Sequence, residues 1–222
     1  MFKCEICRMH ILLVSATEME LGDLYSDHAN VDILLTGVGA PQTTFQLARR
    51  LHQIDYDWVI QLGIAGSFSD EVALGQACLV QRDRFADLLL VDHDSVRTIY
   101  EAGLADPNAF PFEDGWLNNP YLSTLPATYP VANSLTVNTV TGEPGVNQRH
   151  AAKFGAALET MEGAALHYVC REMGIPFLQI RGVSNRVGDR NKANWKIKEA
   201  LQAAHQLFHQ ILATTLPVLE QH

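Results

Sequence analysis

Short apolar runs that end in small or glycine residues recur along this chain and constrain its fold more than any other feature. Six of them have the length and the content of β-branched residues typical of buried strands. They are residues 11–15, 32–39, 58–67, 77–81, 130–137 and 177–184. Because helical patterns lie between them, we expect an α/β fold with a central mixed twisted sheet flanked by helices.

Three segments carry the apolar spacing of helices. Residues 40–53 place Phe45, Leu47, Ala48 and Leu51 largely on one side. Residues 162–173 and 194–212 continue the pattern in the second half of the chain. Residues 103–130 instead carry five prolines and no apolar period, which predicts a loop-rich insertion. We therefore expect a single domain over residues 1–222, with this insertion beside its core.

The composition argues against several classes of function. The 222 residues carry a net charge of −9 and no basic stripe of the kind that nucleic-acid binding needs. No apolar run approaches the about 20 residues of a membrane span, and the first residues lack the apolar core of a signal peptide. We expect a cytoplasmic protein with neither nucleic-acid nor membrane partners.

The cysteines do not indicate a metal site. Cys4 and Cys7 have the spacing of half a zinc site, but Cys78 and Cys170 are single residues in apolar stretches. Reduced cytosolic thiols explain all four. We expect no bound metal and no cofactor.

Polar or glycine-rich loops follow four of the predicted strands, at residues 15–20, 37–39, 63–67 and 181–185. Ligands of open α/β sheets bind at the carboxyl ends of strands, so these loops are candidates for one pocket. The same pattern is also typical of short strand–helix turns in any α/β protein. Gln42 stands where a dinucleotide fingerprint would continue after Gly37 and Gly39, which disfavours a nucleotide-dependent redox enzyme.

Met161 and Glu162 stand at the start of the helix predicted over 162–173. One explanation is structural, because an acid in a first turn favours the positive end of the helix dipole. The other is a ligand site, in which Met161 gives apolar surface and Glu162 accepts hydrogen bonds. In that case we expect Glu159 to be the solvated acid of the helix start. Glu18 is likewise expected to be a solvated first-turn residue.

Taken together, these segments resemble the nucleoside phosphorylase and nucleosidase superfamily over 11–91 and 131–212. The motifs that carry the resemblance are SATEMEL, TGVGAPQTT, GIAGSF, ETMEGAA and IRGVSN. Within the superfamily, ILLVSATEMEL, VNTVTG (137–142) and NRVGDRNKANWKI (185–197) are most similar to the futalosine hydrolase family. The resemblance implies an enzyme that releases hypoxanthine from futalosine in the alternative route to menaquinone. It also implies a purine nucleoside as the small-molecule partner and a homo-oligomer, a dimer or larger.

The resemblance assigns roles to matching residues. Glu20 matches the glutamate that activates the attacking water in the hydrolytic branch. Met161 and Glu162 match the pair under and beside the ribose, where the carboxylate accepts from the hydroxyls. The loop after the first strand lacks the arginine with which phosphorylases bind phosphate, which favours water as the nucleophile. Cleavage then passes through a sugar with oxocarbenium character, as in glycoside hydrolysis.

Asn185 indicates the kind of purine. It matches the position that contacts N7 and the 6-substituent, where adenine nucleosidases carry aspartate. An asparagine amide can donate to O6 of an oxopurine, although it cannot deliver a proton as an acid. An asparagine that stabilises its own turn is the structural alternative. We expect a 6-oxopurine base.

Further substrate contacts are expected from Ala65 and Gly66 through their backbone, and from Val140 and Thr141. Ile64 stands where adenine nucleosidases typically have a hydroxyl side chain, so no contact of that kind is expected there.

Arg181, Arg186 and Arg190 are candidates for holding a substrate carboxylate, because an arginine fork binds carboxylates well. Arg181 is included among the expected binding residues, although the sequence does not choose between the three. Trp195 fits a pocket aromatic and a helix-packing residue equally.

Three different functions stay open on the sequence. Arg84 could meet phosphate, which keeps a phosphate-using purine nucleoside phosphorylase open. An adenine nucleosidase of the methylthioadenosine/S-adenosylhomocysteine type also belongs to the superfamily. A catalytically silent nucleoside-binding protein would share the fold, although the presence of both Glu20 and Glu162 argues against it.

Overall fold

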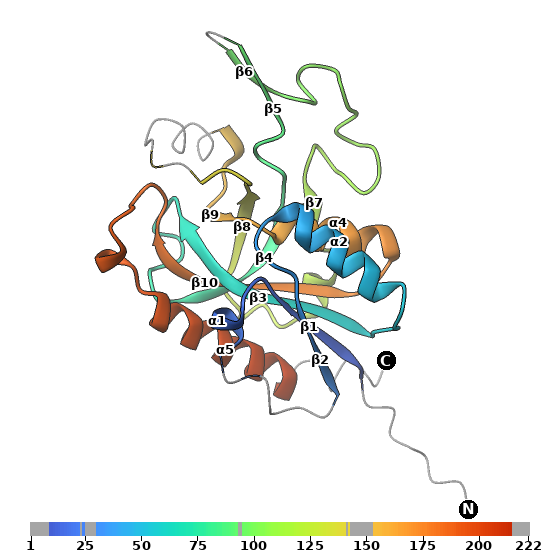
Figure 1. Ribbon diagram of the computed structural model, residues 1–222, viewed down its shortest axis with the longest axis vertical. Coiled ribbons are helices and arrows are strands. Elements are labelled where there is room, and N and C mark those ends of the chain that lie inside the picture. The colour runs from blue at the N-terminus through green and yellow to red at the C-terminus, as the bar shows by residue number, and fades with distance from the viewer. Residues whose placement is uncertain are drawn as a thin grey trace, which may run out of the picture.

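The computed structural model describes residues 9–22, 24, 30–92, 95–140, 142 and 153–214 (Figure 1). A mixed sheet of eight strands forms the centre, in the order β10–β4–β8–β9–β3–β1–β2, with β7 paired to β4. The strands are β1 (Ile11–Ser15), β2 (Val31–Leu35), β3 (Trp58–Ser67), β4 (Ala77–Asp83), β7 (Leu117–Asn118), β8 (Val131–Thr136), β9 (Leu158–Thr160) and β10 (Phe177–Arg186). The predicted α/β class with a mixed sheet is confirmed.

Five of these strands close into a ring, because β10 pairs with β3 as well as with β4. The ring continues from β4 to β8 and β9 and returns from β9 to the end of β3. β1 and β2 extend the sheet from β3 in parallel. The last residues of β3 therefore lie between β9 and β10, and this geometry positions the functional site.

Helices cover the sheet on both faces (Figure 1). α2 (Ala40–Leu51) packs against α4 (Gly163–Met173), and α5 (Ile197–Thr214) packs against β10 and β3. α1 (Glu18–Leu21) is a single turn directly after β1 whose Leu21 joins the core on the α5 side. The helices predicted over 40–53, 162–173 and 194–212 are confirmed, with α5 starting three residues later than expected.

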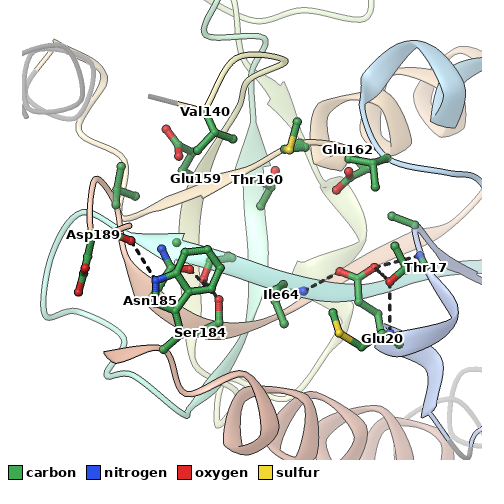
Figure 2. A pocket seen from close by; sticks show the side chains of 18 of the residues that line it. Thr17, Glu20, Ile64, Val140, Glu159, Thr160, Glu162, Ser184, Asn185 and Asp189 are labelled. Atoms are coloured by element: carbon green, nitrogen blue, oxygen red, sulfur yellow. Dashed lines mark hydrogen bonds between the residues drawn. The ribbon is translucent and has the colours of Figure 1, made fainter. Parts of the chain in front are cut away.

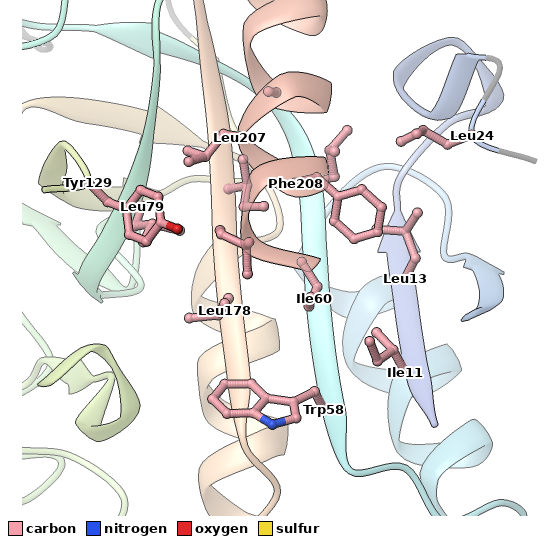
Figure 3. Packing of buried hydrophobic residues seen from close by; sticks show 14 of the residues in the cluster. Ile11, Leu13, Leu24, Trp58, Ile60, Leu79, Tyr129, Leu178, Leu207 and Phe208 are labelled. Atoms are coloured by element: carbon pink, nitrogen blue, oxygen red, sulfur yellow. The ribbon is translucent and has the colours of Figure 1, made fainter. Parts of the chain in front are cut away.

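The strands contribute side chains to two apolar layers, which explains their continuous apolar sequences. Ile11 and Leu13 of β1 belong to one apolar cluster with Phe208 of α5, and Figure 3 shows Leu13 beside the Phe208 ring. Leu12 and Val14, which point to the opposite face, pack with residues of α2 and α4. Burial of both strand faces holds β1 and β3 rigidly at the base of the pocket.

The expectation that Phe45 lies on the apolar face of its helix is wrong. Its side chain is 62% exposed, whereas Leu47 and Leu51 are buried. Residues 45 and 47 are two positions apart and so lie about 200° apart around the helix axis. The buried stripe of α2 is instead completed by Ala40 and Thr43.

Residues 103–130 contain little regular structure: β7 and the short 3₁₀ helix η2 (Pro120–Thr124) interrupt a series of turns. Before them, β5 (Leu89–Asp92) and β6 (Ser95–Thr98) form a separate hairpin that stands away from the body of the molecule in Figure 1. Trp116 and Leu117 are buried, so the end of this region packs on the core. The single domain over 1–222 stays a prediction.

Within the described ranges, no helix is long and apolar enough to cross a membrane. The same part of the chain contains no group of three His, Cys, Asp or Glu side chains suited to a metal ion. Cys78 and Cys170 are buried free thiols. Cys4 and Cys7 lie outside the described residues.

Candidate active site

A pocket of about 240 Å³ lies where the four predicted loops meet (Figure 2). Residues of the turn after β1, Val38 after β2 and the ends of β3 and β10 form half of its wall. β9 with the residues that follow it, Val140, residues 187–190 and Trp195 complete the wall. The predicted convergence of four strand ends on one pocket is confirmed. It follows from the parallel pairing of β2 with β1, of β1 with β3 and of β3 with β10, which places their carboxyl ends at one edge of the sheet.

Glu20 reaches the pocket through a capping box. Thr17 Oγ1 caps α1 by accepting from Glu20 N at 3.4 Å, and Thr17 N donates back to Glu20 Oε2 at 3.2 Å. Ser15 Oγ lies 3.3 Å from the same oxygen, and Ile64 N donates to Oε1 at 3.1 Å. These donors hold the carboxylate in one orientation. Glu18, in contrast, is exposed as predicted.

Glu162 is the N-cap residue of α4, but its side chain makes no capping hydrogen bond. Its Oε1 instead accepts from Gly39 N at 2.9 Å, and its Oε2 lies 3.7 Å from Arg181 Nη1. The residue is 6% exposed and lines the pocket. Burial raises the pKa of Glu162, whereas Arg181 and the Gly39 amide oppose this shift. The carboxylate therefore belongs to the pocket and does not cap the helix.

Gly163 allows α4 to begin where Glu162 can reach the pocket. A Cβ atom at Gly163 would lie 2.1 Å from both Asp83 Oδ2 and Gln179 Nε2, so a larger residue does not fit. Thr136 Oγ1 accepts from Ala164 N at 2.7 Å in the same place. A buried polar network beneath the helix start thus explains why residue 163 is glycine.

Arg181 lies behind Glu162 and is only 1% exposed. Its Nη2 donates to Gln61 Oε1 at 2.6 Å. It supplies positive charge beside the Glu162 carboxylate but is not among the residues that form the pocket wall. Its predicted contact with the substrate stays a prediction.

Asn185 lines the opposite end of the pocket from Glu20 and Glu162 (Figure 2). Its Nδ2 donates to Arg186 O at 2.9 Å, and its Oδ1 accepts from Ser184 Oγ at 2.8 Å. These two bonds fix which way the amide points. Among the residues that the structure describes, the second N–H of Nδ2 has no hydrogen-bond acceptor.

The expectation that Glu159 is a solvated acid at a helix start is wrong. It lies in β9, pairs with Gly66 and Leu135, and is only 8% exposed. Its side chain lines the pocket, where burial raises its pKa to about 7 and Arg190 opposes the shift. A strand of three residues is too short for its pattern to stand out beside the long helix that follows.

Most of the other predicted contact residues also lie at the pocket. Ala65, Gly66, Val140 and Met161 line it, and Thr141 lies outside the described residues. Which substrate atoms these residues contact stays a prediction.

The remaining arginines and Trp195 occupy different places. Arg186 forms an ion pair with Asp70. Arg190 is exposed and lines the pocket. Trp195 also lines the pocket, and its Nε1 donates to Asp189 O at 2.9 Å.

Sequence comparison places the chain among known proteins. The family model described as "Phosphorylase superfamily" matches residues 14–217. A futalosine hydrolase of Thermus thermophilus is 32% identical over 183 residues, covering 81% of this chain and 80% of that protein.

Two solved structures share the fold. One is a 5′-methylthioadenosine/S-adenosylhomocysteine nucleosidase from Colwellia psychrerythraea in complex with adenine, with a TM-score of 0.73, 20% identity and coverage of 93% and 96% of the two chains. The other is the native futalosine hydrolase of Helicobacter pylori, with a TM-score of 0.73, 15% identity and coverage of 90% and 96%.

Proposed function

Because this chain belongs to the phosphorylase superfamily and to its futalosine hydrolase family, we propose that it hydrolyses the N-ribosidic bond of futalosine and releases hypoxanthine. One arrangement carries the proposal: the carboxylates of Glu20 and Glu162 lie at one end of the pocket and the Asn185 amide at the other. This separation suits a bound nucleoside. Its ribose would lie near Glu20, which activates the water, and its purine would lie near Asn185.

Glu20 is the general base for the attacking water. Its carboxylate is oriented by the Thr17 and Ile64 amides, so a water at the pocket side of Oε1 would meet a fixed acceptor. A carboxylate held within hydrogen-bond reach takes the proton as the water oxygen bonds to C1′. Solvent then removes the proton from Glu20 after the product leaves.

Glu162 and Met161 bind the ribose. The Glu162 carboxylate accepts from the ribose hydroxyls, and its negative charge stabilises the positive charge that develops on the sugar. Gly39 N and Arg181 hold it in place. Met161 supplies soft apolar surface against the ring.

Asn185 reads the base. Its free N–H donates to O6 or N7 of the purine, while its bonds to Ser184 and Arg186 prevent the amide from turning over. An adenine amino group would place a donor against this donor. The site therefore favours hypoxanthine over adenine, which argues against the methylthioadenosine/S-adenosylhomocysteine type of nucleosidase.

The charges around the pocket favour water over phosphate as the nucleophile. Among its described lining residues, four are acidic (Glu20, Glu159, Glu162 and Asp189) and only Arg190 is basic. A phosphate dianion would be repelled by the carboxylates among them that are ionised, and Arg190 alone would attract it. Arg84, the sequence candidate for phosphate, is buried outside the pocket and lies against the ring of Phe154.

The test is the release of free base from futalosine, aminodeoxyfutalosine, methylthioadenosine and inosine, with and without phosphate, followed by chromatography. We expect hypoxanthine from futalosine at a rate that phosphate does not change. Formation of ribose-1-phosphate derivatives would overturn the hydrolase, and preferential release of adenine would overturn the choice of base.

We further propose that the enzyme acts as a homo-oligomer, a dimer or larger, in the cytoplasm on the alternative route to menaquinone. Large apolar side chains that are exposed on the single chain support the assembly. They are Phe45, Val91, Leu104 and Phe110. Light scattering during gel filtration would measure the mass, and a monomer at micromolar concentration would contradict this part of the proposal.

A further inference from the structure

Cleavage of the C1′–N9 bond leaves the bonding electron pair on the purine, so the departing base must gain a proton. Asn185 faces the base in the proposed reaction, but an amide has no proton to give at neutral pH. Glu20 cannot supply the proton either, because it must be ionised to accept one from water. An acid is therefore needed at the base end of the pocket.

Glu159 and Asn185 stand on either side of Gly66, on three neighbouring strands. Gly66 of β3 pairs with Glu159 of β9 on one side and with Asn185 of β10 on the other. Strands are spaced by about 4.8 Å, so the two flanking backbones are about 10 Å apart. Gly66 has no side chain between them, although Val187 Cγ2 lies only 2.9 Å from where a Cβ atom of residue 66 would be. Glu159, Gly66, Asn185 and Val187 all line the pocket.

The Glu159 and Asn185 side chains share one face of the sheet. Residues paired across strands point to the same face. A Cβ atom at Gly66 would lie 3.5 Å from Asn185 Nδ2, so the side chain of Asn185 lies on the Gly66 side that faces the pocket. A bicyclic base that packs on Val187 above Gly66 would present one edge to Asn185 and the opposite edge to Glu159.

On these grounds we propose that Glu159 is the general acid that protonates a ring nitrogen of the departing purine on the edge facing β9. The inference rests on the proposed nucleoside hydrolysis. As the C1′–N9 bond breaks, its electron pair passes to the purine and the carboxyl proton of Glu159 passes to the ring nitrogen. The water oxygen bonds to C1′ and gives a proton to Glu20. Solvent then restores the proton of Glu159 and removes that of Glu20.

The surroundings of Glu159 raise its pKa to about 7, so that a substantial fraction of the side chain carries a proton near neutral pH. Burial raises its pKa to about 7, and Arg190 is the one charge that lowers it. Its partners on β3 and β8 are Gly66 and Leu135, neither of which carries charge. The other charged residues of the pocket wall in the described part are acids: Glu20, Glu162 and Asp189. A carboxyl with a pKa near the working pH is suited to general acid catalysis.

The decisive experiment compares leaving groups. Glu159→Gln keeps the shape of the side chain and removes the proton, and futalosine is compared with 4-nitrophenyl β-D-riboside, whose leaving group needs no acid. We expect Glu159→Gln to lower kcat on futalosine about 10²- to 10⁴-fold and to leave the nitrophenyl riboside nearly unchanged. Retained turnover of the riboside also shows that the variant is folded. Glu172→Gln, an exposed acid on α4, is the matched control.

The pH profile gives a second readout. In the wild type, kcat on futalosine should fall as pH rises through about 7, since the acid ionises. Glu159→Gln should lack this fall, and Glu159→Asp should restore it in part. If Glu159→Gln lowered kcat equally on both substrates, or kept the fall of kcat at high pH, the role of Glu159 as the acid would be overturned. The proposed function would still stand. A wild-type protein that hydrolyses neither substrate would overturn the proposed function and the inference with it.

Discussion

Arg181 Nη1 lies 3.7 Å from Glu162 Oε2, and both side chains are almost completely buried. This pair stands directly behind the proposed ribose site, where water cannot screen the charges. Burial raises the pKa of Glu162, and Arg181 opposes the rise. The guanidinium therefore helps to keep Glu162 ionised, in the form that accepts from hydroxyls and stabilises a cation.

Arg181→Met should remove this support. Breaking a buried ion pair by deleting one partner typically costs about 3–5 kcal/mol, and proton uptake by Glu162 will offset part of it. We expect a lower Tm, a higher KM and an acid limb of the pH–rate profile that moves to higher pH. Differential scanning calorimetry and steady-state kinetics across pH check these points.

Arg49→Met, on the exposed side of α2, is the control and should change little. An acid limb that stays in place would show that Arg181 does not act on Glu162.

Glu20→Gln should abolish most of the activity while leaving the fold intact. The amide can still accept one hydrogen bond from Ile64 N, but it cannot take a proton from water. We expect kcat on futalosine to fall about 10²- to 10⁴-fold, with little change in KM. Glu18→Gln is a matched control, because Glu18 is in the same turn but exposed. Full turnover by Glu20→Gln would exclude Glu20 as the base.

Thr17→Ala tests whether the helix cap also orients the base. Loss of the cap should cost about 1 kcal/mol of stability. It also removes the Oγ1 contact, 3.2 Å from Glu20 Oε2, so we expect a several-fold fall in kcat as well. Thr17→Ser, which keeps the hydroxyl, should retain both the wild-type stability and the wild-type kcat. If stability falls and kcat does not, the capping box serves the fold alone.

The parts of the fold that follow from local sequence were predictable. β1 and β3 have the bounds expected from their apolar runs, because both faces of each strand are buried and Gln61 is the one polar residue inside either run. The helix over 162–173 was predictable for the same reason, since the spacing of its apolar residues is a property of the local sequence. The convergence of Glu20, Glu162 and Asn185 could be anticipated, since each follows or ends a strand of one sheet.

Long-range pairing could not be predicted in the same way. The contact of β10 with both β3 and β4 closes the ring, and nothing in the sequence of 177–186 specifies two partners. The strand β9 is only three residues long, and its pattern merges with that of the helix after it. The local pattern therefore predicts a solvated Glu159, although the ring places this residue in the pocket.

Asn185→Asp should change the base preference. An ionised aspartate accepts from the adenine amino group and repels O6 of hypoxanthine. We expect the ratio of kcat/KM for futalosine to that for aminodeoxyfutalosine to fall by about 10²-fold or more. Asn185→Ala should lower both values without reversing the preference. An unchanged ratio in Asn185→Asp would mean that this residue does not read the 6-substituent.

Glu159 should also change how the free energy of unfolding depends on pH, and this effect does not depend on catalysis. Its folded pKa is about 7, above the usual 4.5, so the folded protein holds this proton more tightly than the unfolded chain. The cost of ionising Glu159 in the folded state is absent below pH 4.5. It grows as pH rises and is complete above about pH 7. It amounts to about 3 kcal/mol at most.

Glu159→Gln removes this cost, because the amide does not ionise. The variant should therefore become more stable relative to wild type as pH rises from about 4.5 to 7, and the difference should then level off. Urea unfolding of both proteins at several pH values measures it, and the subtraction cancels the other titrating groups. Glu172→Gln, at an exposed position, is the matched control. A flat difference for Glu159→Gln would mean that Glu159 is already ionised in the folded protein near pH 5, and it could not then serve as an acid at neutral pH.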